Sequence, residues 1–289
     1  MSYAVRAWPA AALLITAFAQ DPRADRIEWI ARDYTYAKGP AWSKDGYLVF
    51  SDTPADRILR WQPGHPREVL REGAAGPAGN AFDAQGRLYT CETRARRVIR
   101  MERNGKIEAL AESWEGKRLN APNDLAVSRS GHVYFTDPAF GESSDRRELD
   151  FYGVYHIPPK GPMKLVAKPA GRPNGIALSP NGRVLYVGNA DEHNIRAYDL
   201  DRDGDASNER VLVAGIADVP GGIAVDEKGN LYVAAGSILI YSPEGRPLGT
   251  IEMSRRASGC AFGDTDGKTL LVTAGGDLVR VLREAQGAN

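Results

Sequence analysis

The chain of 289 residues has few of the side chains that build common metal and nucleophile sites. It contains two cysteines and four histidines, and the histidines are scattered along the sequence. Neither Cys91 nor Cys260 has a histidine at zinc-ligand spacing, so we expect no thiolate zinc site. Gly-x-Ser-x-Gly, His-Glu-x-x-His, Walker and dinucleotide-binding patterns are also missing. The enzyme classes that these patterns identify are therefore not predicted.

The sequence also has no excess of positive or negative charge. Lys and Arg together number 37, and Asp and Glu also number 37, so no basic field favours nucleic-acid binding. Long apolar runs are limited to Ala10 to Ala19, which is too short to span a bilayer. We therefore expect neither nucleic acid nor membrane among the partners.

The same N-terminal segment has the pattern of a secretory signal peptide. Arg6 precedes the apolar run, and Ala17-Phe18-Ala19 forms a small-x-small cleavage site before Gln20. We predict a signal peptide at residues 1–19 and a periplasmic or secreted protein; the alternative is a disordered or helical extension. In an exported protein the two cysteines could pair, but both lie in predicted buried strands, which favours free thiols.

Glycine and proline, by contrast, are abundant, at 31 and 18 residues, and one pattern recurs six times. Each copy has a small-residue strand, a polar turn that ends in glycine, and an aliphatic-aromatic strand. The turn glycines, separated by 40, 45, 51, 47 and 38 residues, are Gly46, Gly86, Gly131, Gly182, Gly229 and Gly267. A period in the forties with several strands per unit is typical of propeller blades.

The repeat predicts an all-β six-bladed β-propeller with four antiparallel strands per blade. In the fourth blade we expect strands at Ile176 to Ser179, Arg183 to Val187, Ile195 to Leu200 and Arg210 to Ala214. The segment Ile27 to Tyr36 has strand character but no copy of the repeat, so we expect it to close the last blade. Residues 20–289 then form a single domain. An open sandwich is the alternative, but it does not require six matched copies.

Equivalent positions of the six copies should form rings around the central channel. Eight residues before the turn glycine, one ring reads Lys38, Ala78, Asn123, Asn174, Gly221 and, with a turn one residue longer, Ser258. The next ring is glycine in five copies and Asp124 in the third. Glycine is expected where backbones crowd, so Asp124 is either a catalytic base or a carboxylate that binds backbone amides.

At these positions the chain resembles the SMP-30/gluconolactonase/LRE-like family of sugar-lactone hydrolases. The segments that carry the resemblance are Pro122-Asn123-Asp124, Tyr134 to Pro138 with Gly141, Arg172 to Gly175, Arg87 to Glu92 with Arg96-Arg97, and Gly259 to Gly263. The resemblance covers nearly the whole mature chain. It implies a lactone substrate and a divalent cation, calcium or zinc, held in the channel by Glu, Asn and Asp ligands.

The sequence departs from the family at two of those ligands. The family's Glu falls on Lys38 and its Asp falls on Gly221, whereas Asn123 and Asn174 match. Two neutral amides beside an ammonium make a poor site for calcium, which prefers six to eight oxygens and usually several carboxylates. A cation is therefore expected from the resemblance but doubtful in this chain, and the protein has either a weakened metal site or none.

Two functions follow. The first is an exported, gluconolactonase-like lactonase, in which water activated by Asp124 attacks a carbonyl held by Asn123, Asn174 and Lys38. The second is a non-catalytic propeller that binds a sugar, a lactone or a protein, with Lys38 as a structural plug of the channel. We expect a monomer that binds a small molecule.

Overall fold

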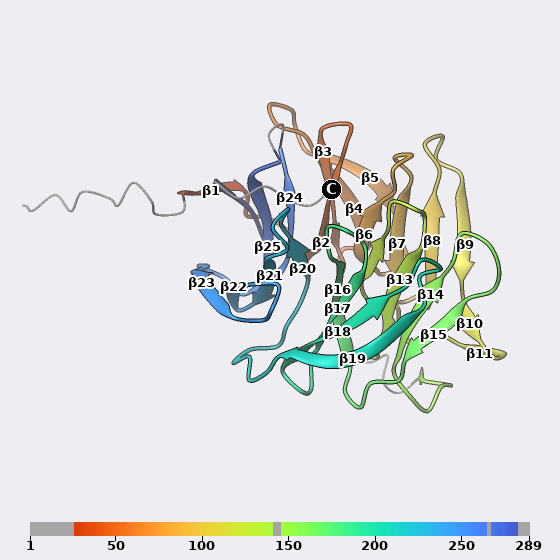
Figure 1. Cartoon of the computed structure of the whole chain (residues 1–289). Coiled ribbons are helices and arrows are strands. Elements are labelled where there is room, and N and C mark those ends of the chain that lie inside the picture. The colour runs from red at the N-terminus through yellow and green to blue at the C-terminus, as the bar shows by residue number, and fades with distance from the viewer. Residues whose placement is uncertain (1–25, 141–145, 265–266, 283–289) are drawn as a thin grey trace, which may run out of the picture.

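The structure is a computed structural model that describes residues 26–140, 146–264 and 267–282. In this part of the chain, six antiparallel four-stranded sheets form the blades of a propeller (Figure 1). The innermost strands contact one another in the order β2, β6, β12, β16, β20, β24 and again β2, so the ring is closed. The predicted six-bladed β-propeller is confirmed. The predicted signal peptide, residues 1–19, lies outside the described residues.

The first three blades follow the chain from the centre of the ring outward. Blade 1 consists of β2 (Ala37–Ser43), β3 (Tyr47–Asp52), β4 (Arg57–Trp61) and β5 (Glu68–Glu72). Blade 2 consists of β6 (Pro77–Phe82), β7 (Leu88–Glu92), β8 (Arg97–Met101) and β9 (Ile107–Ala111). A small hairpin of β10 (Ser113–Trp114) and β11 (Lys117–Arg118) precedes blade 3. Blade 3 consists of β12 (Leu125–Val127), β13 (Val133–Asp137), β14 (Gly153–Ile157) and β15 (Lys164–Ala167).

The last three blades repeat this order, except that the outer strand of the sixth blade comes from the N-terminal part of the chain. Blade 4 consists of β16 (Pro173–Leu178), β17 (Val184–Asn189), β18 (Asn194–Leu200) and β19 (Ala206–Val213). Blade 5 consists of β20 (Ile223–Val225), β21 (Leu231–Ala235), β22 (Ser237–Tyr241) and β23 (Pro247–Ile251). Blade 6 consists of β24 (Ala257–Gly263), β25 (Thr269–Ala274), β26 (Asp277–Leu282) and β1 (Arg26–Ala31).

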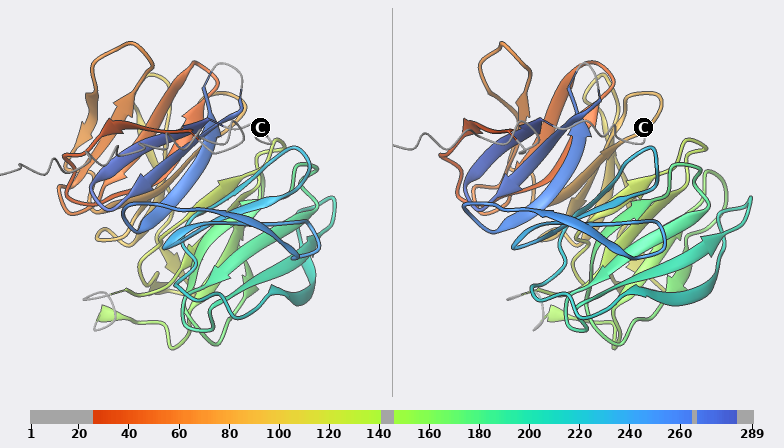
Figure 2. Two further views of the ribbon diagram at one scale, coloured as in Figure 1. Left: turned by 90° about the vertical axis from the view of Figure 1, so that its left-hand side faces the viewer. Right: turned by 60° about the vertical axis from the view of Figure 1, so that its left-hand side comes forward.

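The N-terminal strand closes the ring as predicted. β1 pairs antiparallel with β26, with Arg26 opposite Leu282, and forms the outer strand of the last blade. The red β1 lies beside the blue strands of the C-terminus in both views of Figure 2. An ion pair between Glu28 and Arg280, 2.6 Å from Oε2 to Nε, joins the same two strands. Closure by strands from both ends of the chain leaves the inner strands in a fixed circle.

The turn glycines behave as the repeat predicts. Gly46 and Gly86, for example, have φ values of 84° and 78°, in the left-handed region that favours glycine. In blade 4 the outer strand begins at Ala206, four residues before the predicted Arg210. The difference arises because Asp201 Oδ1 accepts hydrogen bonds from the N–H groups of Asp203 and Asp205, which shortens the loop.

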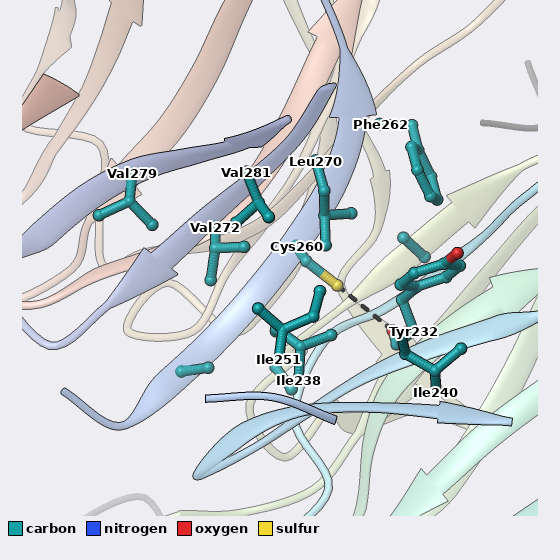
Figure 3. Packing of buried hydrophobic residues seen from close by; sticks show 13 residues of the cluster. Tyr232, Ile238, Ile240, Ile251, Cys260, Phe262, Leu270, Val272, Val279 and Val281 are labelled. Carbon is teal, nitrogen blue, oxygen red and sulfur yellow. Dashed lines mark hydrogen bonds between the residues drawn. The ribbon is translucent and has the colours of Figure 1, made fainter. Parts of the chain in front are cut away.

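The core lies in the contacts between neighbouring blades. Figure 3 shows one of these layers, where blades 5 and 6 pack through a cluster that includes Tyr232, Ile238, Leu270 and Val272. Cys260 belongs to this cluster, and its Sγ donates a hydrogen bond of 3.3 Å to the carbonyl of Tyr232. Cys91 and Cys260 are both buried and free, as predicted. None of the described segments is a helix long and apolar enough to cross a membrane.

Candidate active site

The inner strands enclose a cavity of about 580 Å³ at the centre of the ring. The four polar residues predicted to form the site all line it: Lys38 from blade 1, Asn123 and Asp124 just before blade 3, and Asn174 from blade 4. Gly221, at the position of a family ligand, also lines it. Residues that lie far apart in the sequence therefore meet at one cavity, at the positions that the ring alignment gives.

Three of these side chains form a continuous chain of hydrogen bonds. The Lys38 ammonium donates to Asn123 Oδ1 at 2.7 Å. Asn123 Nδ2 then donates to Asn174 Oδ1 at 2.7 Å, and Asn174 Nδ2 donates to the Pro220 carbonyl at 2.8 Å. The chain crosses from blade 1 to the segment before blade 5, so each amide has a defined orientation.

Asp124 has a separate set of partners. Its Oδ1 accepts from the Leu125 N–H at 3.0 Å and its Oδ2 accepts from the Ile176 N–H at 3.3 Å. The carboxylate therefore binds backbone amides, which is one of the two roles considered for it, and it also lines the cavity, as the other role requires. Burial raises the pKa of Asp124 to about 6, although the Lys38 charge and the two N–H groups lower it. A carboxylate with this pKa is ionised at neutral pH and is a stronger base than an exposed aspartate.

Lys38 lines the cavity and is half-buried. Burial lowers the pKa of its ammonium below the ordinary value of a lysine, and the negative charge of Asp124 opposes this shift. The two groups therefore stabilise each other's charged form. The cavity lining therefore contains a basic and an acidic group whose charges attract each other.

Glycines of the second ring make room for this arrangement. A Cβ added at Gly39 would overlap the Ala78 carbonyl, and a Cβ at Gly175 would overlap the Gly221 carbonyl. At Gly79 the overlap would be with the Asp124 carboxylate itself, and Asp124 Cα would lie only 2.6 Å away. Neighbouring backbones touch at the channel, as the glycine pattern predicts, and Asp124 fits because its neighbour has no side chain.

Gly79→Ala should therefore displace the Asp124 carboxylate. We expect a loss of about 1–3 kcal/mol in the free energy of unfolding, the usual cost of overpacking a core. Any hydrolytic activity should fall as well. Gly249→Ala is the matched control, because a Cβ there meets no atom within 4 Å. Thermal unfolding of the two variants makes the comparison, and equal stabilities would contradict the packing described here.

The residues of the site do not fit a divalent ion of the family's kind. Asn123 Oδ1 accepts from the Lys38 ammonium and Asn174 Oδ1 accepts from Asn123, so both amide oxygens already have donors. A divalent ion near Lys38 would also be repelled by several kcal/mol at an effective dielectric of about 20. Within residues 26–140, 146–264 and 267–282, no group of three or more His, Cys, Asp or Glu side chains could hold a metal.

Several residues of the site are not predicted from the sequence. Thr136 Oγ1 donates to the Asn174 carbonyl at 2.7 Å, so it ties β13 to the strand that carries Asn174. Phe140 and Arg256 line the cavity, and the Arg172 guanidinium lies 4.9 Å from the centre of the Phe140 ring. Phe140 lies in the long segment between β13 and β14. The other contacts depend on blades that are distant in the chain.

The histidines are less scattered than the sequence indicates. His132 Nδ1 and His156 Nε2 lie 2.7 Å apart in blade 3, and the His156 ring stacks on Tyr134. Burial lowers the pKa of His156 to about 4. Neither histidine lines the central cavity, so this pair is separate from the candidate site.

A closed propeller with a polar, carboxylate-containing channel is a scaffold shared by binding proteins and hydrolases. Residues 36–276 match the family model of the SMP-30/gluconolactonase/LRE-like region, and the chain belongs to that family. It is 34% identical to a gluconolactonase of Zymomonas mobilis over 287 residues, which covers 88% of this chain and 80% of that protein. The family that the sequence resembles is confirmed.

Solved structures agree with this assignment. A gluconolactonase of Xanthomonas campestris has a TM-score of 0.83 and 34% identity, with 89% of each chain covered. A calcium-binding regucalcin of Agrobacterium tumefaciens has a TM-score of 0.73 and 18% identity, with 89% of this chain and 92% of that chain covered. At that identity the second similarity shows the fold alone.

Proposed function

We propose that this protein hydrolyses a sugar lactone or a similar cyclic ester in its central cavity without a divalent ion as the electrophile. The observation that carries the proposal is the joint placement of Asp124 and the Lys38–Asn123–Asn174 chain around one cavity. A base and a cationic hydrogen-bond donor are the two groups that ester hydrolysis needs. Relatives that share the scaffold include proteins named gluconolactonase.

In the proposed reaction, Asp124 takes a proton from water as the water oxygen attacks the lactone carbonyl carbon. The carbonyl oxygen gains negative charge, which the Lys38 ammonium stabilises by hydrogen bonding. The intermediate then collapses, the ring oxygen leaves, and Asp124 returns the proton to it. One water is consumed, and the product is an open-chain hydroxy acid.

The second candidate is a propeller that binds a sugar or lactone without hydrolysing it. It is favoured by the engagement of both amide oxygens and both Asp124 oxygens with protein donors. In this case the Lys38 ammonium closes the floor of the channel. We further propose export of the protein, on the pattern of residues 1–19.

Hydrolysis of a panel of sugar lactones, followed with a pH indicator after chelator treatment, tests the proposal. We expect activity that survives chelation and does not rise when calcium, zinc or manganese is added back. Activity that appears only with added metal would contradict the metal-independent mechanism. No activity under any of these conditions would favour the binding protein instead.

A further inference from the structure

The Lys38 ammonium has more hydrogen-bond donors than the protein supplies acceptors. A protonated lysine offers three N–H donors. Among the described residues, the ammonium donates to Asn123 Oδ1, and no carboxylate lies within salt-bridge distance of it. The two remaining donors belong to a side chain that faces the cavity. An acceptor from outside the protein would complete the ammonium's coordination.

The neighbouring oxygens have donors of their own. Asn174 Oδ1 accepts from Asn123, and the two Asp124 oxygens accept from backbone N–H groups. These bonds orient the oxygens of Asn174 and Asp124 toward donors other than Lys38. The floor of the cavity therefore presents a cation that is held in place but incompletely paired, which is a suitable partner for a charged acceptor.

Apart from Lys38 and Asp124, the cavity lining contains one more charged side chain among the described residues. Arg256 also lines the cavity, but its guanidinium forms an ion pair with Asp218. Of the two basic side chains that line the cavity among the described residues, Lys38 is therefore the one with no carboxylate within salt-bridge distance. Hydroxyl and amide side chains of Thr53, Thr93 and Asn80 also line the space, and such neutral polar walls suit a polyhydroxylated ligand.

We infer that the cavity binds the carboxylate of a sugar acid through the Lys38 ammonium. This inference concerns the same site as the proposed function and identifies its product as a ligand, because opening a sugar lactone yields a sugar acid. Charge-assisted hydrogen bonds between an ammonium and a carboxylate are among the strongest in proteins. The acid should therefore compete with the lactone. Binding itself requires no hydrolysis, so it applies equally to a non-catalytic propeller.

The test compares two open-chain ligands of similar size by isothermal titration calorimetry: gluconate, which has a carboxylate, and sorbitol, which has a hydroxymethyl group instead. The wild-type protein should bind gluconate at least about tenfold more tightly, the lower end of what a charged hydrogen bond contributes. Lys38→Met should remove this preference. Lys44→Met is the matched control in the same blade, since Lys44 is exposed and lies outside the cavity.

Asp124→Asn separates this inference from the proposed function. Removing the negative charge beside Lys38 should tighten gluconate binding, whereas it should lower the rate of hydrolysis at least about 100-fold. Equal affinities of the wild type for gluconate and sorbitol, or no binding of gluconate, would overturn the inference whether or not lactones are hydrolysed. Gluconate binding without any lactone hydrolysis would uphold the inference and reject the enzyme.

Discussion

Asp124→Asn should lower kcat/KM for lactone hydrolysis between about 100-fold and 10,000-fold, the range that a general base contributes. The substitution keeps the shape of the side chain but removes the group that accepts the proton from water. Because the carboxylate is held by the N–H groups of Leu125 and Ile176, an amide oxygen can retain one of these bonds. Circular dichroism and thermal unfolding should show an unchanged fold, and steady-state kinetics measures the loss.

The pH dependence of the wild-type enzyme supplies an independent check. The base must be ionised, so kcat/KM should rise with pH through about 6, the pKa of Asp124. At higher pH it should fall as Lys38 loses its proton, below the ordinary range of a lysine because burial lowers its pKa. Asp226→Asn is the control, since that buried carboxylate binds the N–H groups of a turn outside the cavity. An unchanged profile in Asp124→Asn would exclude Asp124 as the base.

Lys38→Glu combined with Gly221→Asp should create a calcium site in the cavity. The first change converts a charge of +1 into −1, and the second adds another negative charge. Coulomb's law gives about 4 kcal/mol for each pair of unit charges at about 4 Å and an effective dielectric near 20. We expect calcium affinity to increase at least about 100-fold over the wild type, equivalent to about 2.8 kcal/mol. Isothermal titration calorimetry measures the increase.

A Lys-to-Glu substitution outside the cavity provides the control for the first of these changes. Lys44→Glu alters an exposed side chain of blade 1 and should leave calcium binding unchanged. A Cβ at Gly221 would lie 2.8 Å from the Ser258 carbonyl, so that backbone must shift slightly to accept Asp. Calcium binding no tighter than in the control would show that the oxygens of Asn123 and Asn174 do not turn toward a common centre.

The blades could be predicted from the sequence because each is a local unit. A turn glycine, such as Gly46, and the strands beside it depend on residues close in the chain, and six copies reinforce one another. The closing strand was also predictable, since one segment with strand character was left without a copy. Exact strand ends were less predictable. In blade 4, the Asp201 carboxylate accepts hydrogen bonds that shorten a loop. The sequence composition predicts a longer loop there.

The candidate site was predictable only as a set of positions. Ring alignment places Lys38, Asn123, Asp124 and Asn174 at one cavity because equivalent residues of a propeller share a radius and a depth. Which oxygen accepts from which donor depends on side-chain orientations across blades, and one sequence carries no signal for these. The hydrogen bond from Thr136 to the Asn174 carbonyl is an example, because it joins two blades through a single hydroxyl.

Closure of blade 6 by β1 also has a consequence for synthesis of the protein on the ribosome. Of the described strands, β1 is synthesised first and its partner β26 last. Until then β1 presents unpaired backbone groups and the half-exposed Trp29, a hazard for association between nascent chains. The other five blades can form in order during translation, whereas the circle is completed only after the C-terminal strand is released.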